Sequence, residues 1–179
     1  MDYRKKFFVS PGKKVNLGKI DPSATGGYAS HEEALPEIRK HVARMDELQY
    51  LLYADASRSL LVVLQALDAA GKDGTIRHLF SGMNPQGTSV FGFKQPSAAE
   101  AAHDFLWRAH QRVPGKGEIT IFNRSHYEDV LVTRVHNLVP KEVWSKRFDQ
   151  INDFERLLER NGTAILKFFL HITPEEQLE

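Results

Sequence analysis

A loop of small residues with a single lysine is the segment whose residue types point most directly to chemistry. It reads ALDAAGKDGT over residues 66–75 and has four residues between its first position and Gly-Lys, the spacing of phosphate-binding loops. Small residues let backbone N–H groups converge on phosphate oxygens, and the lysine adds a positive charge. The phosphate-binding residues predicted from this pattern are Ala69, Ala70, Gly71, Lys72, Asp73, Gly74 and Thr75.

The loop departs from the usual pattern in two places. Ala66 replaces the first glycine, and Asp73 stands where a magnesium-binding Ser or Thr usually follows the lysine. Carboxylates at Asp68 and Asp73 would repel phosphate unless a cation lay between them. We therefore expect Mg²⁺ in this site, with Asp68 on its protein side. The alternative interpretation is an ordinary strand-to-helix turn with a solvated lysine.

A second polar cluster, NRSHYED at residues 123–129, follows another predicted strand. In open parallel sheets, ligands bind beyond the carboxyl ends of the strands, so this cluster and the loop 66–75 are expected to face the same space. Arg124 could stabilise charge on a transferred phosphoryl group through paired hydrogen bonds. A structural ion pair with Glu128 or Asp129 is the alternative role for this arginine.

Alternating strands and helices are predicted around these two segments. The apolar run 60–64 lacks polar alternation, which is typical of a strand buried on both faces of a parallel sheet. Further strands are predicted at 89–93, 118–122 and 163–172, and helices at 75–80 and 141–160. Such crossover connections predict an α/β fold in three layers, a parallel sheet with helices on both faces.

Capping signals predict two more helices. Ser30 and Glu33 have capping-box spacing ahead of an apolar stripe that recurs at steps of three and four. Ser97 and Glu100 have the same spacing and are expected to open one helix that ends before Pro114-Gly115.

Length and composition limit the classes of protein. The 179 residues fit one domain at the usual ~100–200 residues, and no cysteine is present, so disulfides, thiolate nucleophiles and cysteine-ligated metals are excluded. The longest aliphatic run is far shorter than the ~20 residues of a membrane helix. We expect a soluble, cytoplasmic protein without a membrane partner.

Charge is unevenly distributed along the chain. The net charge of +1 does not favour a nucleic-acid partner, but residues 1–20 carry six basic side chains against Asp2 alone. We expect residues 1–29 to form a basic arm and loop and residues 30–179 to form the folded core. The arm is interpreted as a solvated leader, with contact to a polyanion as the alternative.

The motifs resemble the polyphosphate kinase 2 family, P-loop phosphotransferases that move phosphate between inorganic polyphosphate and nucleotides. The resemblance covers residues from about 60 to 178, through LLVVLQALDAAGKDGTI, FGFKQPSAAEAAHDFLWRAHQRVPGKGEITIFNRSHYEDVL and FFLHITPEEQ. The stretch NRSHYEDV is more specific than the loop alone. With Asn123 and Glu128-Asp129, it looks like the subgroup that accepts both AMP and ADP.

The resemblance implies roles for individual residues. Lys72 and the Gly71–Thr75 backbone would cradle phosphate. Asp68 would be the magnesium-linked acid, and Arg124 would stabilise charge on the phosphoryl group. The expected catalytic residues are therefore Asp68, Lys72 and Arg124. Glu128 would lie near the acceptor nucleotide. Many relatives carry an aspartate in place of Asn123, which puts direct metal binding at that position in doubt.

A long polyanionic donor needs a groove with positive charge along it. We expect Arg77 and Lys94 to line this groove. Arg108 and Arg112 are spaced i, i+4, and are interpreted as the solvated face of a helix.

The resemblance also implies a helical lid after the segment HITPEEQ. Thr173 and Pro174 open a helix just before the last residue, so we expect a chain truncated ahead of the lid, with weak or absent turnover. The expected function is reversible, Mg²⁺-dependent transfer of phosphate from polyphosphate to AMP or ADP by a homo-oligomer. The alternatives are an ATP-dependent nucleoside monophosphate kinase and a non-catalytic nucleotide-binding or assembly module.

Overall fold

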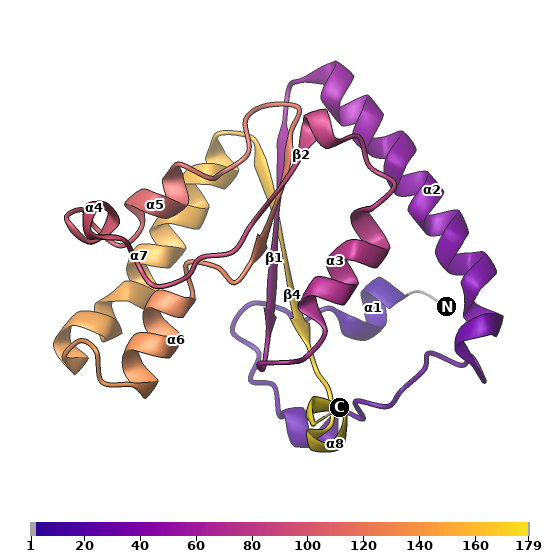
Figure 1. The fold of residues 1–179 in the computed structure, drawn as a ribbon, viewed down its shortest axis with the longest axis horizontal. Helices are drawn as coiled ribbons and strands as arrows, with labels where there is room; N and C mark the ends of the chain where they lie inside the picture. Colours follow the sequence, from indigo (N-terminus) through magenta and orange to yellow (C-terminus); the bar gives the residue numbers. More distant parts are fainter. Residues whose placement is uncertain (1–2, 179) are drawn as a thin grey trace.

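A single parallel sheet lies at the centre of the molecule (Figure 1). The computed structural model describes residues 3–178; Met1, Asp2 and Glu179, at the ends of the two expected segments, lie outside the described residues. The four strands have the order β2-β3-β1-β4 and are β1 (Ser59–Ala66), β2 (Thr88–Phe91), β3 (Ile119–Asn123) and β4 (Thr163–Leu170). All neighbouring strands pair in parallel, so their carboxyl ends share one edge of the sheet.

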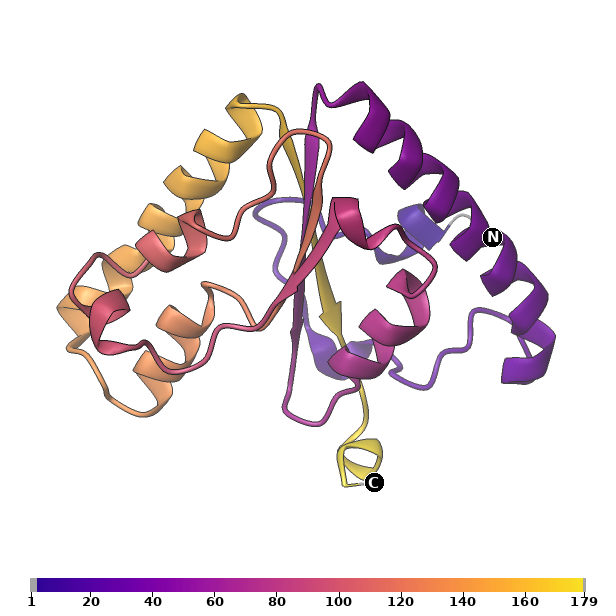
Figure 2. The ribbon, with the colours of Figure 1, turned by 45° about the horizontal axis from the view of Figure 1, so that its top comes forward.

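Helices cover both faces of this sheet, as the three-layer prediction required. Figures 1 and 2 show α2 and α3 on one face and α4 to α7 on the other. The longer helices are α2 (His31–Asp55), α3 (Lys72–Phe80), α6 (Glu128–Val135) and α7 (Lys141–Arg160). The shorter ones are α1 (Tyr3–Phe7), η1 (Leu17–Lys19), η2 (Pro85–Gly87), α4 (Ala98–Ala101), α5 (Trp107–His110) and α8 (Pro174–Gln177).

The central strand β1 contributes side chains to the hydrophobic core on each face of the sheet. Its side chains alternate between faces, so Leu61 and Val63 pack towards α7, whereas Val62 and Leu64 pack towards α2 and α3. All four are at most 3% exposed, which explains the continuous apolar run in the sequence. The two cores fix β1 firmly, and with it the start of the loop that follows.

The expected single helix after Ser97 is wrong. Ser97 and Glu100 do form a capping box, but α4 ends at Ala101 and α5 begins at Trp107. Asp104 accounts for the break, since its carboxylate accepts the backbone N–H of Leu106 at 3.0 Å and its carbonyl accepts that of Trp107 at 3.1 Å. A side chain that bonds to nearby backbone in this way competes with helix continuation.

Two other elements differ from the sequence prediction. α3 begins at Lys72, three residues before the expected Thr75, and α6 was not predicted at all. By contrast, α7 has the predicted bounds, and Ser30 caps α2 as expected by accepting the backbone N–H of Glu33 at 3.3 Å. Between residues 3 and 29 the structure describes the helices α1 and η1, and the expected role of this segment as a separate basic arm stays a prediction.

Candidate phosphate-transfer site

The loop between β1 and α3 has the backbone form of an anion cradle. Ala69 and Gly71 adopt left-handed backbone conformations with φ of 61° and 72°. Gly71 is the residue before the first turn of α3, and its carbonyl accepts the backbone N–H of Thr75 at 2.9 Å. The helix therefore begins at Lys72, and the N–H groups of its first turn point out of the helix end without a side chain at Gly71 to cap them.

The space around this helix start is open. A Cβ atom added at Gly71 or Gly74 would meet nothing within 4 Å. Lys72 Nζ donates to the carbonyl of Leu67 at 3.1 Å, which folds the lysine back over its own loop. The predicted cradle thus has exposed N–H groups and a cation on one side, a combination that suits phosphate oxygens.

The second polar cluster lies beside the loop, as expected. Parallel pairing sets Asn123 at the end of β3 opposite Leu64 of β1. The Asn123 side-chain amide donates to Asp73 Oδ1, and Arg124 Nη2 lies 3.6 Å from Asp68 Oδ1. The two carboxylates that the sequence singled out therefore each face a side chain from the second cluster.

Arg124 is free to act on a ligand as well as on Asp68. Its side chain is 53% exposed and that of Asp68 is 89% exposed, so their ion pair is weak and easily rearranged. The alternative prediction for Arg124 is wrong for Asp129, which pairs instead with Arg108, whereas Arg124 does act electrostatically on Glu128.

Glu128, the first residue of α6, belongs to the same group of charges. Burial raises the pKa of its carboxyl, and the nearby cations Arg124 and Lys72 partly oppose that rise. Asp68 raises the pKa a little further. These electrostatic interactions indicate that Glu128, the residue expected near the acceptor nucleotide, lies close to the loop 66–75.

The two residues expected to line a polyphosphate groove are not equally well placed. Lys94 is exposed and directly follows Phe93, whose backbone N–H donates to the carbonyl of Arg124 at 3.3 Å. Lys94 therefore lies beside the second cluster. Arg77 is exposed on α3, and the described residues provide its side chain with no hydrogen bond or ion pair to the loop.

Arg108 does not lie on a solvated helix face, so that interpretation is wrong. It is 7% exposed, pairs with Asp129 at 2.9 Å and donates to the carbonyl of Lys94 at 2.6 Å. Arg112 is exposed and lies over the ring of Phe91 at 4.7 Å. Arg108 therefore holds the segment that carries Lys94 against α6.

Two glutamines support the site and were not predicted from the sequence. Gln177 of α8 donates from Nε2 to the carbonyl of Asp68 at 2.9 Å, and Gln65 at the end of β1 donates to Ser125 Oγ at 2.7 Å. The capping sequence around Thr173 predicted the helix that carries Gln177, and Thr173 does cap it. Its partner, 109 residues earlier, has no local signal in the sequence.

The oxygen atoms around the loop fit a Mg²⁺ ion that is shared with a phosphate ligand. No group of three acidic or histidine side chains that could hold a metal occurs within residues 3–178. However, Mg²⁺ usually binds through one or two carboxylates, water and substrate phosphates. Asp68 and Asp73 supply the carboxylates, and Asn123 Oδ1 is buried without a hydrogen-bond partner among the described residues.

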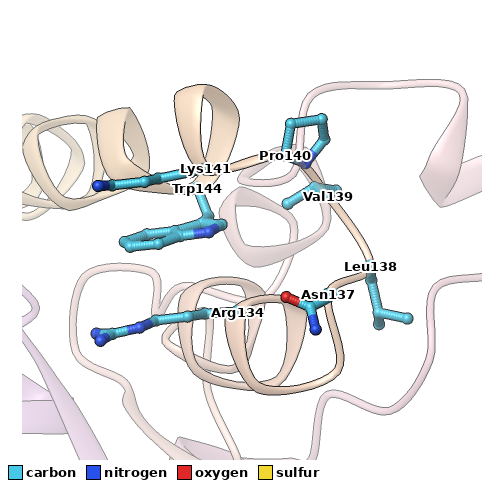
Figure 3. Close-up of a pocket in the computed structure, with 7 residues that line it drawn as sticks. All are labelled: Arg134, Asn137, Leu138, Val139, Pro140, Lys141 and Trp144. Atoms are coloured by element: carbon cyan, nitrogen blue, oxygen red, sulfur yellow. The ribbon is translucent and has the colours of Figure 1, made fainter.

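A pocket of about 550 Å³ lies elsewhere, at the turn between α6 and α7 (Figure 3). Its lining residues are Arg134, Asn137, Leu138, Val139, Pro140, Lys141 and Trp144. Arg134 lies 4.9 Å from the centroid of the Trp144 ring. The pocket contains none of the predicted site residues, so it is distinct from the phosphate loop.

Comparison with known proteins agrees with this geometry. The sequence model of the family "Polyphosphate kinase 2 (PPK2)" matches residues 28–179. The chain belongs to this family. The crystal structure of polyphosphate kinase 2 from Arthrobacter aurescens TC1 superposes with a TM-score of 0.87 at 39% identity, over 95% of this chain and 61% of that one.

Two curated relatives within the polyphosphate kinase 2 family have described activities. The AMP/ADP-polyphosphate phosphotransferase of Meiothermus ruber is 54% identical over 97% of this chain and 65% of its own length. The ADP-polyphosphate phosphotransferase of Rhodopseudomonas palustris is 48% identical over 97% of this chain and 64% of its own. The chain thus spans slightly less than two thirds of these relatives. None of the described helices is both long enough and apolar enough to cross a membrane.

Proposed function

We propose that this chain transfers a phosphoryl group from inorganic polyphosphate to AMP or ADP, forming ADP or ATP in a reversible, in-line reaction. The observation that carries the proposal is the meeting of two segments: the loop with Lys72 and Asp68 lies against the turn with Arg124 and Glu128. The names of the relatives in Meiothermus ruber and Rhodopseudomonas palustris support polyphosphate as donor and AMP or ADP as acceptor.

The protein's part in this reaction is positioning and charge neutralisation. The N–H groups of residues 71–74 and the Lys72 ammonium bind phosphate oxygens, and Arg124 stabilises the charge on the phosphoryl group during its transfer. Glu128 lies on the side of the acceptor nucleotide. Arg77 and Lys94 are proposed to contact the polyphosphate chain.

Asp68 and Asp73 are proposed to hold Mg²⁺ together with substrate phosphates. When bound, the ion neutralises phosphate charge and orients the reacting groups. Asn123 orients the Asp73 carboxylate by donating to it. A homo-oligomeric state and a cytoplasmic location stay predictions of the sequence.

The test is ATP formation from ADP, Mg²⁺ and long-chain polyphosphate, with the Meiothermus ruber relative as the positive control for the assay. Lys72→Ala is expected to lower kcat/KM by about 100-fold or more, since it removes a charge that acts on the transferred group. Lys40→Ala, an exposed lysine of α2, is the matched control and is expected to behave like the wild type.

Exchanging the donor separates the alternatives. Transfer to AMP from ATP, without transfer from polyphosphate, would show a nucleoside monophosphate kinase. ADP binding without turnover from either donor, both by this chain and by a version extended to the length of the Meiothermus ruber relative, would show a nucleotide-binding module. Both outcomes would overturn the proposed reaction.

A further inference from the structure

A polar network lies on the side of the β3–α6 turn away from the phosphate loop. Tyr127 Oη donates to Glu155 Oε1 at 2.6 Å, and Lys167 Nζ donates to Glu155 Oε2 at 2.6 Å and to Tyr127 Oη at 3.0 Å. His126 Nε2 lies 3.4 Å from Glu155 Oε1. The network joins the turn to α7, which carries Glu155, and to β4, which carries Lys167.

The network is largely buried and charged. The side chain of His126 is fully buried, that of Glu155 is 10% exposed and that of Lys167 is 48% exposed. Burial alone would raise the pKa of Glu155, but contacts with His126, Lys167 and Tyr127 outweigh it and bring the pKa to about 2. The carboxylate therefore stays ionised at neutral pH.

Stability alone does not account for a charged network at this position. A well-packed apolar cluster is often as stable as a buried ion pair, because each charge loses its hydration. The network instead fixes the orientation of the side chains that it joins, since each hydrogen bond requires a particular distance and angle. Its hydrogen-bonded anchor in the turn is Tyr127, which lies between Arg124 and Glu128 in the sequence. His126 lies near the Glu155 carboxylate without a hydrogen bond to it.

The turn also needs to be held, because its conformation is strained. Arg124 has a left-handed backbone with φ of 75°, which for a residue other than glycine costs about 1–3 kcal/mol and persists only where surrounding structure imposes it. On the sheet side, Gln65 bonds to Ser125 and the backbone of Phe93 bonds to Arg124. Glu155 supplies the corresponding restraint from α7.

We propose that Glu155 is a positioning residue: through Tyr127 it holds the turn that presents Arg124 to the transferred phosphoryl group. This role rests on the proposed function, since it concerns the geometry of that reaction. Glu155 touches neither phosphate nor nucleotide in this arrangement. It acts by fixing where the Arg124 guanidinium lies relative to Asp68 and Lys72.

The kinetic consequence differs from that of simple destabilisation. A displacement of about 1 Å in a group that acts on the transition state costs up to about 100-fold in rate. Arg124 acts most strongly on the charge that develops during transfer, so loosening the turn lowers kcat more than it raises KM. A merely structural loss would instead reduce the folded fraction and leave kcat per folded molecule unchanged.

The experiment compares Glu155→Gln and Tyr127→Phe with Glu159→Gln, an exposed glutamate on the same helix. Each variant of the 179-residue chain is measured well below its melting temperature in three ways. The measurements are kcat and KM for polyphosphate and ADP, ADP binding by calorimetry, and hydrogen exchange of the peptide that covers residues 123–128.

Glu155→Gln and Tyr127→Phe are each expected to lower kcat by about 10-fold or more, with KM within about threefold of the wild type. Exchange of residues 123–128 is expected to speed up by about tenfold in both, while the rest of the chain keeps its protection. The double variant is expected to lose no more than the stronger single one, because both changes release the same turn. Glu159→Gln is expected to change none of these quantities.

Unchanged exchange of residues 123–128 in both variants overturns the inference, whatever the activity. So does a kcat loss that disappears when activity is divided by the folded fraction. If the wild type transfers no phosphate from polyphosphate, the proposed function fails, and hydrogen exchange still decides whether Glu155 holds the turn.

Discussion

Replacing Arg108 by methionine is expected to destabilise the protein strongly. The guanidinium is 7% exposed, pairs with Asp129 and also donates to the carbonyl of Lys94. Methionine fills much of the volume but removes the ion pair of the buried Asp129 carboxylate and the hydrogen bond to the Lys94 carbonyl. Removal of one member of a buried ion pair costs about 3–5 kcal/mol, a large part of a typical domain's stability.

The measurement is urea unfolding followed by circular dichroism, with Arg112→Met as the matched control. Arg112 is exposed and lies over the face of Phe91 in a cation–π geometry, so its loss is expected to cost about 1 kcal/mol or less. Adding Asp129→Leu to Arg108→Met is expected to recover most of the lost stability, because no uncompensated charge then remains in the core.

A different result would refute this reasoning. If Arg108→Met costs no more than Arg112→Met and raises KM for polyphosphate, the guanidinium contacts the donor instead of supporting the fold. Recovery of stability in the double variant would show that Arg108 stabilises the fold through its pair with Asp129 and not through a contact with another group. Lack of recovery would mean that the cost comes from lost packing against Phe93, 5.4 Å from the guanidinium carbon.

Three further predictions concern Gln177, Glu128 and Glu155. Gln177→Ala is expected to lower kcat/KM about three- to tenfold by freeing the Asp68 carbonyl, and Gln177→Glu to lower it further, because a carboxylate would face that carbonyl; steady-state kinetics measure both. Glu128→Gln is expected to raise the melting temperature at neutral pH while lowering activity with AMP, since burial raises the pKa of this carboxyl and its ionised form is costly. Protonation of Glu155 as pH falls from 4.5 to about 2 is expected to reduce the free energy of unfolding by up to about 3 kcal/mol, because its lowered pKa stabilises the fold only while it is ionised; urea unfolding of Glu155→Gln should lack this change.

The features that the sequence predicted well are those with a local cause. The apolar run at 60–64 marked the central strand because both of its faces are buried. The bounds of α7 followed from its apolar spacing and from the Asn161-Gly162 end, where Gly162 has a φ of 90°. The loop at 66–75 was placed correctly between a strand and a helix, because its small residues and its lysine stand next to each other, and phosphate binding by it stays a prediction.

The features that were missed depend on partners far away in the sequence. Arg108 looked like part of a solvated helix face because its pattern is amphipathic, and only the fold places Asp129 beside it. The Asp104 break depends on a side chain that competes for backbone N–H groups, which periodicity does not detect. Gln177 of α8 bonds to Asp68 and Glu155 of α7 bonds to Tyr127, so no spacing within a motif reveals these two contacts.

The charges of the proposed site favour binding of a cation together with the substrates. Three carboxylates (Asp68, Asp73 and Glu128) face two cations (Lys72 and Arg124) in the part of the chain that the structure describes. The proposed donor and acceptor add only negative charge. A bound cation would offset this repulsion, so we expect phosphate binding and divalent-cation binding to be mutually dependent at this site.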